Sequence, residues 1–557
     1  MKINIFARGT SPSTNLKILS VGFLGIILML LATTIFIIDP VRTIVKSQMS
    51  FRKGSTLFKV WQKPPLDIFI TVYMFNVTNY DRFSRGVDHK MKLEEVGPYV
   101  YQEFLENHNA TFHANNTVTF VPKRTVKFVR ERSVGDPKVD KIIAPNLPYL
   151  GATSLASSFS MITAMALRAL TRQLQSKTML DITVHDYLWG YEDRLVYLAS
   201  KLIPQIINFE KFGLLERMFN EGHNVVNMHL PGSKVSKDQQ PKYYREFSIN
   251  TWNNEKSIHY WTNSRKQNLT NCNRVYGTFD GSLFPHDIEK GEIFRIYRKT
   301  FCRTLPIVFT HPSTINGIEA YNFKLHEKSF DSDLSDRDSS CFCKNRKCLK
   351  RGLGNITPCY YNIPLAISFP HFFNADPSLL KPFEGLDPNE RKHGTEIALQ
   401  PQLGIPMSVK SRFQVNLAMS DVSFNGEVQR FRNMVLPIFW LQIGLDDLTP
   451  YLKTLLILSF KVGPIAQDFL MITLIAAGLS SIACAIWKSL PESLTKYATI
   501  KTIKFPLDRR VSVKRPDTSI QPLLQDEKTI ELQNWIDEDE KGSVFTFTPV
   551  EDSGETF

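Results

Sequence analysis

Two long apolar runs without a charged residue, one near each end of the chain, most constrain its fold. The first covers residues 18–38 and the second covers residues 469–487. As helices they would be about 31 Å and about 28 Å long, which is enough to cross the hydrocarbon core of a bilayer. The first run is too long for the core of a signal peptide and lacks a small-residue cleavage site. The sequence therefore predicts two transmembrane helices.

Charges and glycosylation motifs predict how the chain lies across the membrane. The net charge is +13, and basic residues crowd the C-terminal side of the second run, which favours a cytosolic C-terminus. Five Asn-x-Thr triplets all fall between the two runs. They begin at Asn76, Asn109, Asn115, Asn268 and Asn355. We therefore expect cytosolic ends at residues 1–17 and 488–557, and a glycosylated extracellular or lumenal domain at residues 39–468.

Six of the seven cysteines also lie between the two runs, and they should pair as disulfides in an oxidising compartment. The cluster at residues 341–359 would suit zinc in a reducing compartment, so zinc is the alternative. Cys341 and Cys343 are two residues apart and would point to opposite faces of a strand, so they should take different partners. Spacing alone does not choose those partners. Cys484 lies in the second run, as a lipid-facing thiol or as a palmitoylation site.

The segment between the runs is predicted to be rich in strands. Residues 39–150 are expected to be mostly strands, since stretches such as residues 67–75 carry many β-branched and aromatic side chains. Short strands separated by Pro and Gly are also expected over residues 243–323 and 359–445.

The uncharged segment 149–167 could be a third span, but it would then place the glycosylation motifs on both sides of the membrane. We expect it instead to begin a single soluble helix, whose apolar stripe packs on its own domain or faces a partner or lipid. The stripe comprises Leu155, Phe159, Ile162, Ala166, Leu170 and Leu174. Arg168, Arg172 and Lys177 suit a carboxylate or phosphate head group, or a solvated helix face. A second helix is expected over residues 192–203.

Motifs for catalysis, metal binding and nucleic-acid binding are missing. The sequence has no Gly-x-Ser-x-Gly elbow, no His-Glu-x-x-His helix and no glycine-rich phosphate loop. His371 is expected to be a structural histidine. The acidic stretch 331–338 lacks the Gly and the terminal Glu of a calcium-binding loop. No basic helix with base-reading side chains is evident. We therefore expect no enzyme activity, cofactor, metal or nucleic-acid partner.

The tail at residues 488–557 begins basic and ends acidic, so its first part should lie against anionic lipids and the rest should be disordered. Two stretches match motifs read by cytosolic sorting adaptors. Tyr497 to Ile500 has a Tyr-x-x-bulky pattern, and Leu523-Leu524 is a dileucine in which Ser519 replaces the usual acidic residue.

Motifs along the chain resemble the class B scavenger receptors, a family that includes fatty-acid translocase and the lysosomal integral membrane protein. The resemblance covers both apolar runs and nearly all of the segment between them. The motifs, in chain order, are residues 61–65, 75–79, 95–99, 133–137 and 188–191, then Asp280-Gly281-Ser282, the Cys-x-Cys cluster, residues 369–372 and residues 375–377.

The resemblance implies an α+β architecture. In it, a large antiparallel β-barrel is capped by a helical apex, here about residues 150–220, and an apolar tunnel runs toward the membrane. It also implies three disulfides within residues 272–359, which would join Cys272 to Cys341, Cys302 to Cys359 and Cys343 to Cys348. A lysine pair that holds fatty-acid head groups in the translocase corresponds to Gln173 and Gln175 here, so Arg172 and Lys177 are the nearest basic substitutes.

Three functions follow from the resemblance as expectations. The first is a receptor that binds lipids, lipoproteins or lipid-bearing particles at the apex and passes lipid through the tunnel to the membrane. The second is an endolysosomal trafficking receptor, with a lumenal protein cargo and cytosolic sorting adaptors. The third is a debris or adhesion receptor with a closed tunnel. The expected location is the plasma membrane, the endosome-lysosome membrane or both.

Overall fold

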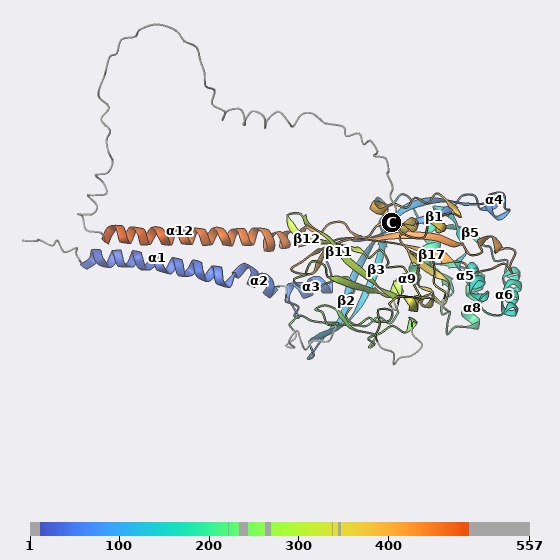
Figure 1. The fold of residues 1–557 in the computed structure, drawn as a ribbon, viewed down its shortest axis with the longest axis horizontal. Helices are drawn as coiled ribbons and strands as arrows, with labels where there is room; N and C mark the ends of the chain where they lie inside the picture. The colour runs from blue at the N-terminus through green and yellow to red at the C-terminus, as the bar shows by residue number, and fades with distance from the viewer. Residues whose placement is uncertain are drawn as a thin grey trace, which may run out of the picture. The chain divides into compact units, whose positions relative to one another are not determined.

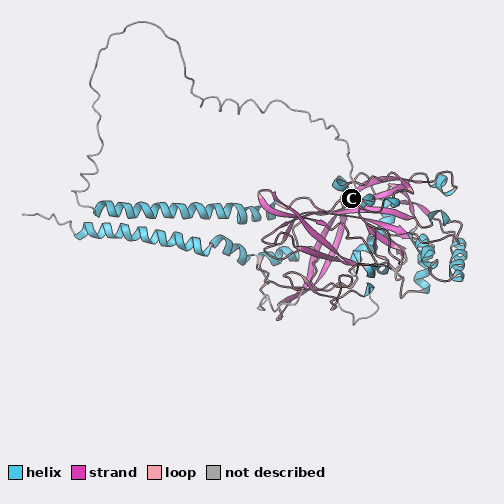
Figure 2. Cartoon of the chain, viewed as in Figure 1, coloured by secondary structure: helices cyan, strands magenta, loops and turns pink. Residues whose placement is uncertain are grey.

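The computed structural model describes residues 12–48, 50–220, 222–232, 243–261, 269–336, 338–343 and 347–489. Strands gather into one body from which two long helices extend (Figure 2). The fold therefore combines helices with a large sheet, as expected.

The two long helices are α1 (Pro12–Ile38) and α12 (Gly463–Ser489). By length and composition both could cross a membrane, and most of their side chains are exposed. Short α2 (Pro40–Gln48) continues from α1 into the body. A π-helical turn, Leu458–Val462, joins α11 (Pro450–Ile457) to α12 without a break. The predicted run 469–487 is thus part of a longer helix, because the π-helical turn keeps the backbone helical ahead of the apolar segment.

Small residues let α1 and α12 lie side by side (Figure 1). A Cβ placed on Gly25 would lie 2.8 Å from the carbonyl oxygen of Gly478, which shows how closely the two backbones approach. Near the body, the Gln467 side chain donates to the Asp39 carboxylate (3.2 Å) and accepts from the backbone N–H of Val41 (3.0 Å). The two helices are therefore joined at their body-side ends as well as along their length.

One antiparallel sheet forms most of the body, and its strands pair in the order β10-β11-β12-β16-β17-β18-β1-β2-β3-β8-β9. These strands are β10 (Ile293–Arg298), β11 (Arg303–Ile315), β12 (Ile318–Leu325), β16 (Glu396–Gln400), β17 (Ile405–Ala418), β18 (Val435–Leu445), β1 (Ile68–Val77), β2 (Met91–His113), β3 (Thr117–Phe128), β8 (Val226–His229) and β9 (Ile249–Trp252). β14 (Leu365–Ser368) pairs with β17, β13 (Gly354–Asn355) pairs with β14, and β15 (Phe383–Glu384) pairs in parallel with β2. The predicted antiparallel sheet is confirmed.

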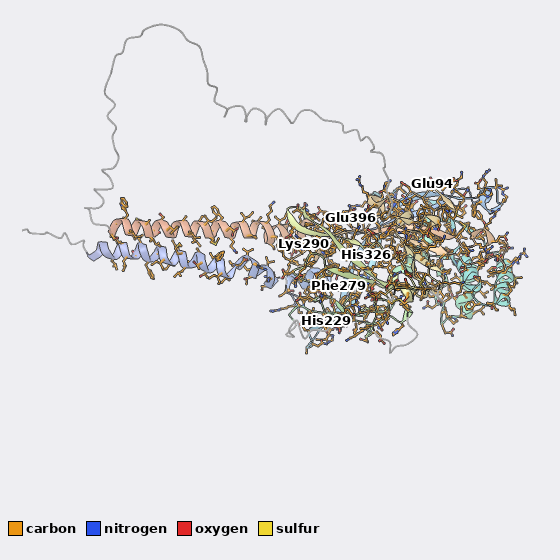
Figure 3. All side chains as sticks on the ribbon, in the orientation of Figure 1. Glu94, His229, Phe279, Lys290, His326 and Glu396 are labelled. Atoms are coloured by element: carbon orange, nitrogen blue, oxygen red, sulfur yellow. A yellow bond between two sulfur atoms is a disulfide. The ribbon has the colours of Figure 1, made fainter. Side chains whose placement is uncertain are left out.

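The sheet is not closed into a barrel by strand pairing, which corrects that expectation. Within the described residues, the end strands β10 and β9 do not pair with each other, and the segment 277–279 hydrogen-bonds to both. Phe279 (labelled in Figure 3) donates its N–H to the Arg295 carbonyl (2.8 Å), and Gly277 donates to Ile249 (2.8 Å). Gly277 turns the chain at φ +74°, a conformation that favours glycine. The segment then makes an isolated bridge to β10, between Phe279 and Ile296, and no ladder.

Helices α5 (Leu147–Ala156), α6 (Met161–Gln173) and α8 (Arg194–Leu202) lie at the end of the body opposite α1 and α12 (Figure 1). The single helix predicted from residue 149 is wrong, because the chain breaks at residues 157–160. The Ser157 and Ser158 hydroxyls bond nearby carbonyls, and Ser160 caps α6 by accepting the Thr163 N–H (3.2 Å). The second predicted helix is α8, which begins after its cap, Asp193.

Shorter helices occupy positions around the sheet. The prediction of mostly strands over residues 39–150 is wrong for its first part, where α2 and α3 (Thr56–Gln62) precede β1. Capping explains α3, since the Ser55 side chain accepts the N–H of Phe58 (3.2 Å). Other short elements are α7 (Val184–Trp189), α9 (Leu214–Phe219), α10 (Glu390–His393), β6 (Tyr191–Glu192) and β7 (Lys211–Phe212).

The described cysteines between the long helices form three disulfides. They join Cys272 to Cys341, Cys302 to Cys359 and Cys343 to Cys348, the pairs that the family resemblance implies. Cys484 is a free, exposed cysteine on α12. Cys302 is fully buried and lies beside β11. Its disulfide to Cys359 therefore connects the segment around Cys359 to the sheet.

Candidate functional site

Two cavities lined by strands of the large sheet, including β2, β3, β17 and β18, are the candidate site. The first, which we call the proximal chamber, has a volume of ≈ 150 Å³ and is lined by side chains from α3 and from α11, which leads into the long helix α12. Trp61, Leu452 and Leu456 are among these side chains. Most of its wall is apolar, so the proximal chamber suits hydrocarbon better than water.

The second cavity, the central chamber, has a volume of ≈ 110 Å³ and lies against Phe284, Phe301 and Phe413. It shares part of its wall with the proximal chamber, including Val409 of β17 and Ile443 of β18. A smaller distal chamber of ≈ 20 Å³ shares Phe301 and Phe413 with the central one and reaches Phe212 of β7. Three mostly apolar cavities therefore follow one another along the inside of the sheet.

An ion pair lines both larger chambers. The Arg124 Nε lies 2.9 Å from a carboxylate oxygen of Glu103, and these side chains are only 8% and 5% exposed. Glu103 on β2 lies diagonally across from Arg124 on β3, since the register pairs Glu103 with Val126 and Leu105 with Arg124. Arg298 lines the same two chambers. Charged groups thus stand where the two larger apolar chambers share a wall.

The helical end of the body presents exposed apolar side chains, which we call the apical patch: Phe159, Met161, Ile162 and Met165. Phe159 is 65% exposed and Ile162 is 82% exposed. The apolar stripe in the sequence included Phe159 and Ile162 but not Met161 and Met165, which are also exposed on α6. Such a cluster is typical of a surface that contacts lipid or another protein.

The basic residues predicted beside this patch have different surroundings. Arg168 donates to the backbone carbonyl of Phe424 (3.0 Å), and Arg172 lies 3.7 Å from the Glu427 carboxylate. Both side chains therefore tie α6 to the segment before β18. Lys177 is exposed, as are Gln173 and Gln175.

The glycosylation motifs differ in accessibility. Asn109 and Asn115 are exposed, Asn76 is half-buried, and Asn268 lies outside the described residues. Asn355 is only 5% exposed, and its side chain donates to the Phe342 carbonyl (3.1 Å) and accepts the Thr357 N–H (3.0 Å). The Asn355 amide nitrogen, to which a glycan would be attached, therefore donates a hydrogen bond inside the folded protein.

Asn355→Gln is expected to leave electrophoretic mobility on denaturing gels unchanged, because a side chain held inside the fold carries no glycan. Asn115→Gln, at an exposed motif, is the matched comparison. Its mobility is expected to increase by the shift that corresponds to the loss of one glycan. A mobility increase for Asn355→Gln that disappears after enzymatic deglycosylation would contradict this expectation.

His371 lies in a buried cluster that joins β1, β2 and β18. Its Nε2 lies 2.6 Å from the Glu95 carboxylate, which also accepts from the Trp440 indole (2.7 Å). Its Nδ1 accepts the Asp387 N–H, and its ring stacks on that of His393 at 4.4 Å. Burial raises the pKa of Glu95, but the hydrogen bonds from His371 and Trp440 outweigh it and hold that pKa below its usual value. Both ring nitrogens of His371 have partners, and its backbone N–H donates to the Gln414 side chain (2.7 Å), which is typical of a structural histidine.

Two histidines make the body sensitive to acid. Burial, and to a lesser extent His371, lower the pKa of His393 to about 4; burial likewise lowers the pKa of His229 (labelled in Figure 3) to about 4. The unfolded chain takes up these protons near pH 6.5 while the folded chain does not, so stability falls as pH decreases from 6.5 toward 4.

His393→Gln is expected to reduce the loss of thermal stability between pH 6.5 and pH 4.5 by on the order of 1–2 kcal/mol. The measurement is the melting temperature of the full-length protein at both pH values. His89→Gln, at an exposed histidine, serves as the control and should keep the wild-type pH dependence. Equal pH dependence of His393→Gln and the wild type would refute the assignment.

Two points of the sequence analysis remain, the sorting motifs and metal binding. Tyr497, Ile500, Leu523 and Leu524 lie outside the described residues. Within the described residues, no cluster of three or more His, Cys, Asp or Glu side chains could hold a metal ion.

The chambers themselves were not anticipated residue by residue. Their walls come from strands far apart in the chain, such as β2, β3, β17 and β18. The available signal was a charged residue at alternate positions with largely apolar ones: Glu103 lies between Tyr101 and Leu105, and Arg124 lies between Pro122 and Val126.

Comparison with known proteins identifies the family. The model of the CD36 family matches residues 21–489. Lysosome membrane protein 2 of Homo sapiens is 30% identical over 425 residues, which cover 75% of this chain and 84% of that protein. Scavenger receptor class B member 1 of Bos taurus is 27% identical over 428 residues, covering 76% of this chain and 80% of that protein. This chain, a scavenger receptor-like membrane protein with two candidate spans, belongs to the CD36 family.

Proposed function

We propose that this protein binds lipid-bearing particles at the apical patch and passes lipid through the chambers to the membrane. The observation that carries the proposal is the row of mostly apolar chambers, which share wall residues and end beside α11. A relative named scavenger receptor class B member 1 is consistent with a receptor role. No catalytic residue, cofactor or metal is required for this function.

Elementary energetics make such a route effective. Each methylene of an acyl chain costs about 0.8 kcal/mol when exposed to water. A passage lined by Leu452, Phe301 and Phe413 would spare the chain most of that cost between particle and bilayer. We also propose that both termini are cytosolic, that residues 39–468 lie outside the cytosol, and that exposed Asn109 and Asn115 carry glycans.

A second candidate is a trafficking receptor whose apical patch binds a lumenal protein and whose tail is read by sorting adaptors. The similarity to a protein named lysosome membrane protein 2 favours it. In this case the apical patch would bind protein, and the chambers would transfer no lipid.

Phe159→Glu combined with Ile162→Glu is expected to lower binding of lipid particles by about tenfold or more, because two charges on a contact surface must be desolvated. The fold should persist, since both side chains are exposed. The assay measures binding of labelled lipoprotein or lipid emulsion to cells that carry the full-length protein, followed by transfer of the lipid.

Val87→Glu is the matched control, because Val87 is an exposed apolar residue outside the apical patch. Its binding should equal that of the wild type. Unchanged particle binding by the Phe159 and Ile162 variant would remove α6 from the site. Absence of lipid transfer by the wild type, together with a lumenal protein that co-purifies with it, would favour the trafficking receptor.

A further inference from the structure

We propose that the Glu103–Arg124 ion pair is a head-group station, a point inside the protein that selects lipids carrying a carboxylate or phosphate over lipids without a charged head group. The inference rests on the proposed transfer function and adds a determinant of specificity to it. The pair lies in the wall shared by the proximal and central chambers.

Stability is a weak reason for a buried ion pair at this position. Removing two charges from water costs several kcal/mol per ion, and apolar residues of similar volume often stabilise a protein as well or better. The surrounding wall is built from apolar residues such as Leu105, Val409 and Ile443, which would pack against an apolar pair without that cost. A ligand that binds beside the pair would give these two charges a role at this position.

The charges nearby favour an anionic head group. Two guanidiniums, those of Arg124 and Arg298, and the carboxylate of Glu103 line both chambers. Asp280 lines only the proximal chamber, and its carboxylate accepts both the N–H (2.9 Å) and the hydroxyl (2.7 Å) of Ser282. Where the chambers meet, positive groups therefore outnumber negative ones.

A guanidinium carries five N–H donors in a planar fork, which matches the two oxygens of a carboxylate or phosphate. Such a head group can bind at Arg124 while its acyl chain lies in the apolar wall on either side. A sterol ester or triacylglycerol offers no charged oxygen. Its passage would remove water from the ion pair without supplying new hydrogen bonds to it, which costs free energy. The station therefore raises the transfer rate of lipids with a charged head group relative to the transfer rate of fully apolar lipids.

The test replaces both charges together, by Glu103→Leu with Arg124→Met, so that neither ion is left buried alone. Full-length protein is reconstituted in vesicles, and the transfer rates of labelled oleic acid, phosphatidylcholine and cholesteryl oleate are measured separately. The preference for one or both charged lipids over cholesteryl oleate is expected to fall about tenfold, the effect of losing one charge-assisted hydrogen bond. Loss for oleic acid alone identifies a carboxylate ligand, and loss for phosphatidylcholine alone identifies a phosphate.

The matched control is Lys63→Met with Glu106→Leu, which removes an exposed ion pair in which Glu106 lies on the same strand as Glu103. It should keep the wild-type preference. An unchanged preference in the Glu103 and Arg124 variant, at an unchanged melting temperature, overturns the proposal while leaving lipid transfer itself intact.

A second measurement uses the wild type and so does not depend on how the variant folds. Oleic acid with a diazirine next to its carboxylate is bound and photolysed, and the labelled peptides are identified by mass spectrometry. Labels within residues 99–128, 405–413 or 441–445, or on Arg298, support the station. Labels confined to other parts of the chain overturn it, whether or not the protein transfers lipid.

Discussion

Val409→Trp is expected to lower lipid transfer by about tenfold or more while particle binding at the apical patch stays normal. Val409 is half-buried on β17 and lines both the proximal and the central chamber. An indole at this position would occupy the space through which an acyl chain must pass. For lipid to pass, the indole would have to move aside and expose or displace buried apolar surface, at a cost of about 1.5–3 kcal/mol. A barrier higher by this amount lowers the transfer rate by about tenfold or more.

The measurement compares transfer of labelled lipid into vesicles that hold the wild-type or variant protein, and the melting temperature reports the fold. Val409→Ala, which widens the same position, should transfer lipid at least as fast as the wild type. Val87→Trp adds the same indole at an exposed position, 57% accessible, and should have no effect. Transfer at the wild-type rate by a correctly folded Val409→Trp protein would contradict passage through the chambers.

Replacing Cys302 and Cys359 together by alanine is expected to cost about 4 kcal/mol of stability. The disulfide joins residues 57 apart in sequence, and opening a loop of that size releases much chain entropy in the unfolded state. The matched variant replaces Cys343 and Cys348, only 5 apart, and is expected to cost about 2 kcal/mol by the same relation.

Urea unfolding of the full-length protein in detergent measures this difference, and the fraction retained inside the cell reports its consequence for export. Cys302 is fully buried beside β11, so its loss should also loosen the wall of the central and distal chambers, to which Phe301 contributes. Equal stability of the two double variants would show that loop size is not what makes the Cys302–Cys359 disulfide important.

The apical helices show where local reasoning reached its limit. The apolar stripe placed Phe159 and Ile162 on a helical surface, yet Ser157, Ser158 and Ser160 divide the segment by bonding to the nearby backbone. A serine within a helical pattern can remain in the helix or can end it, and the choice depends on the packing around it. Met161 and Met165, which follow this break, are surface residues of α6.

Patterns along the chain determined the elements that depend on neighbouring residues: two helices long enough to span a membrane, strands rich in β-branched and aromatic residues, and the helix that begins after Asp193. Only the tertiary structure decided which residues face one another across the inside of the sheet. Glu95, for example, meets His371 and Trp440, which are 276 and 345 residues away. The chambers, the Glu103–Arg124 pair and the burial of Asn355 have the same origin. Each depends on which strands are neighbours and in what register they pair, and interactions between distant parts of the chain fix both.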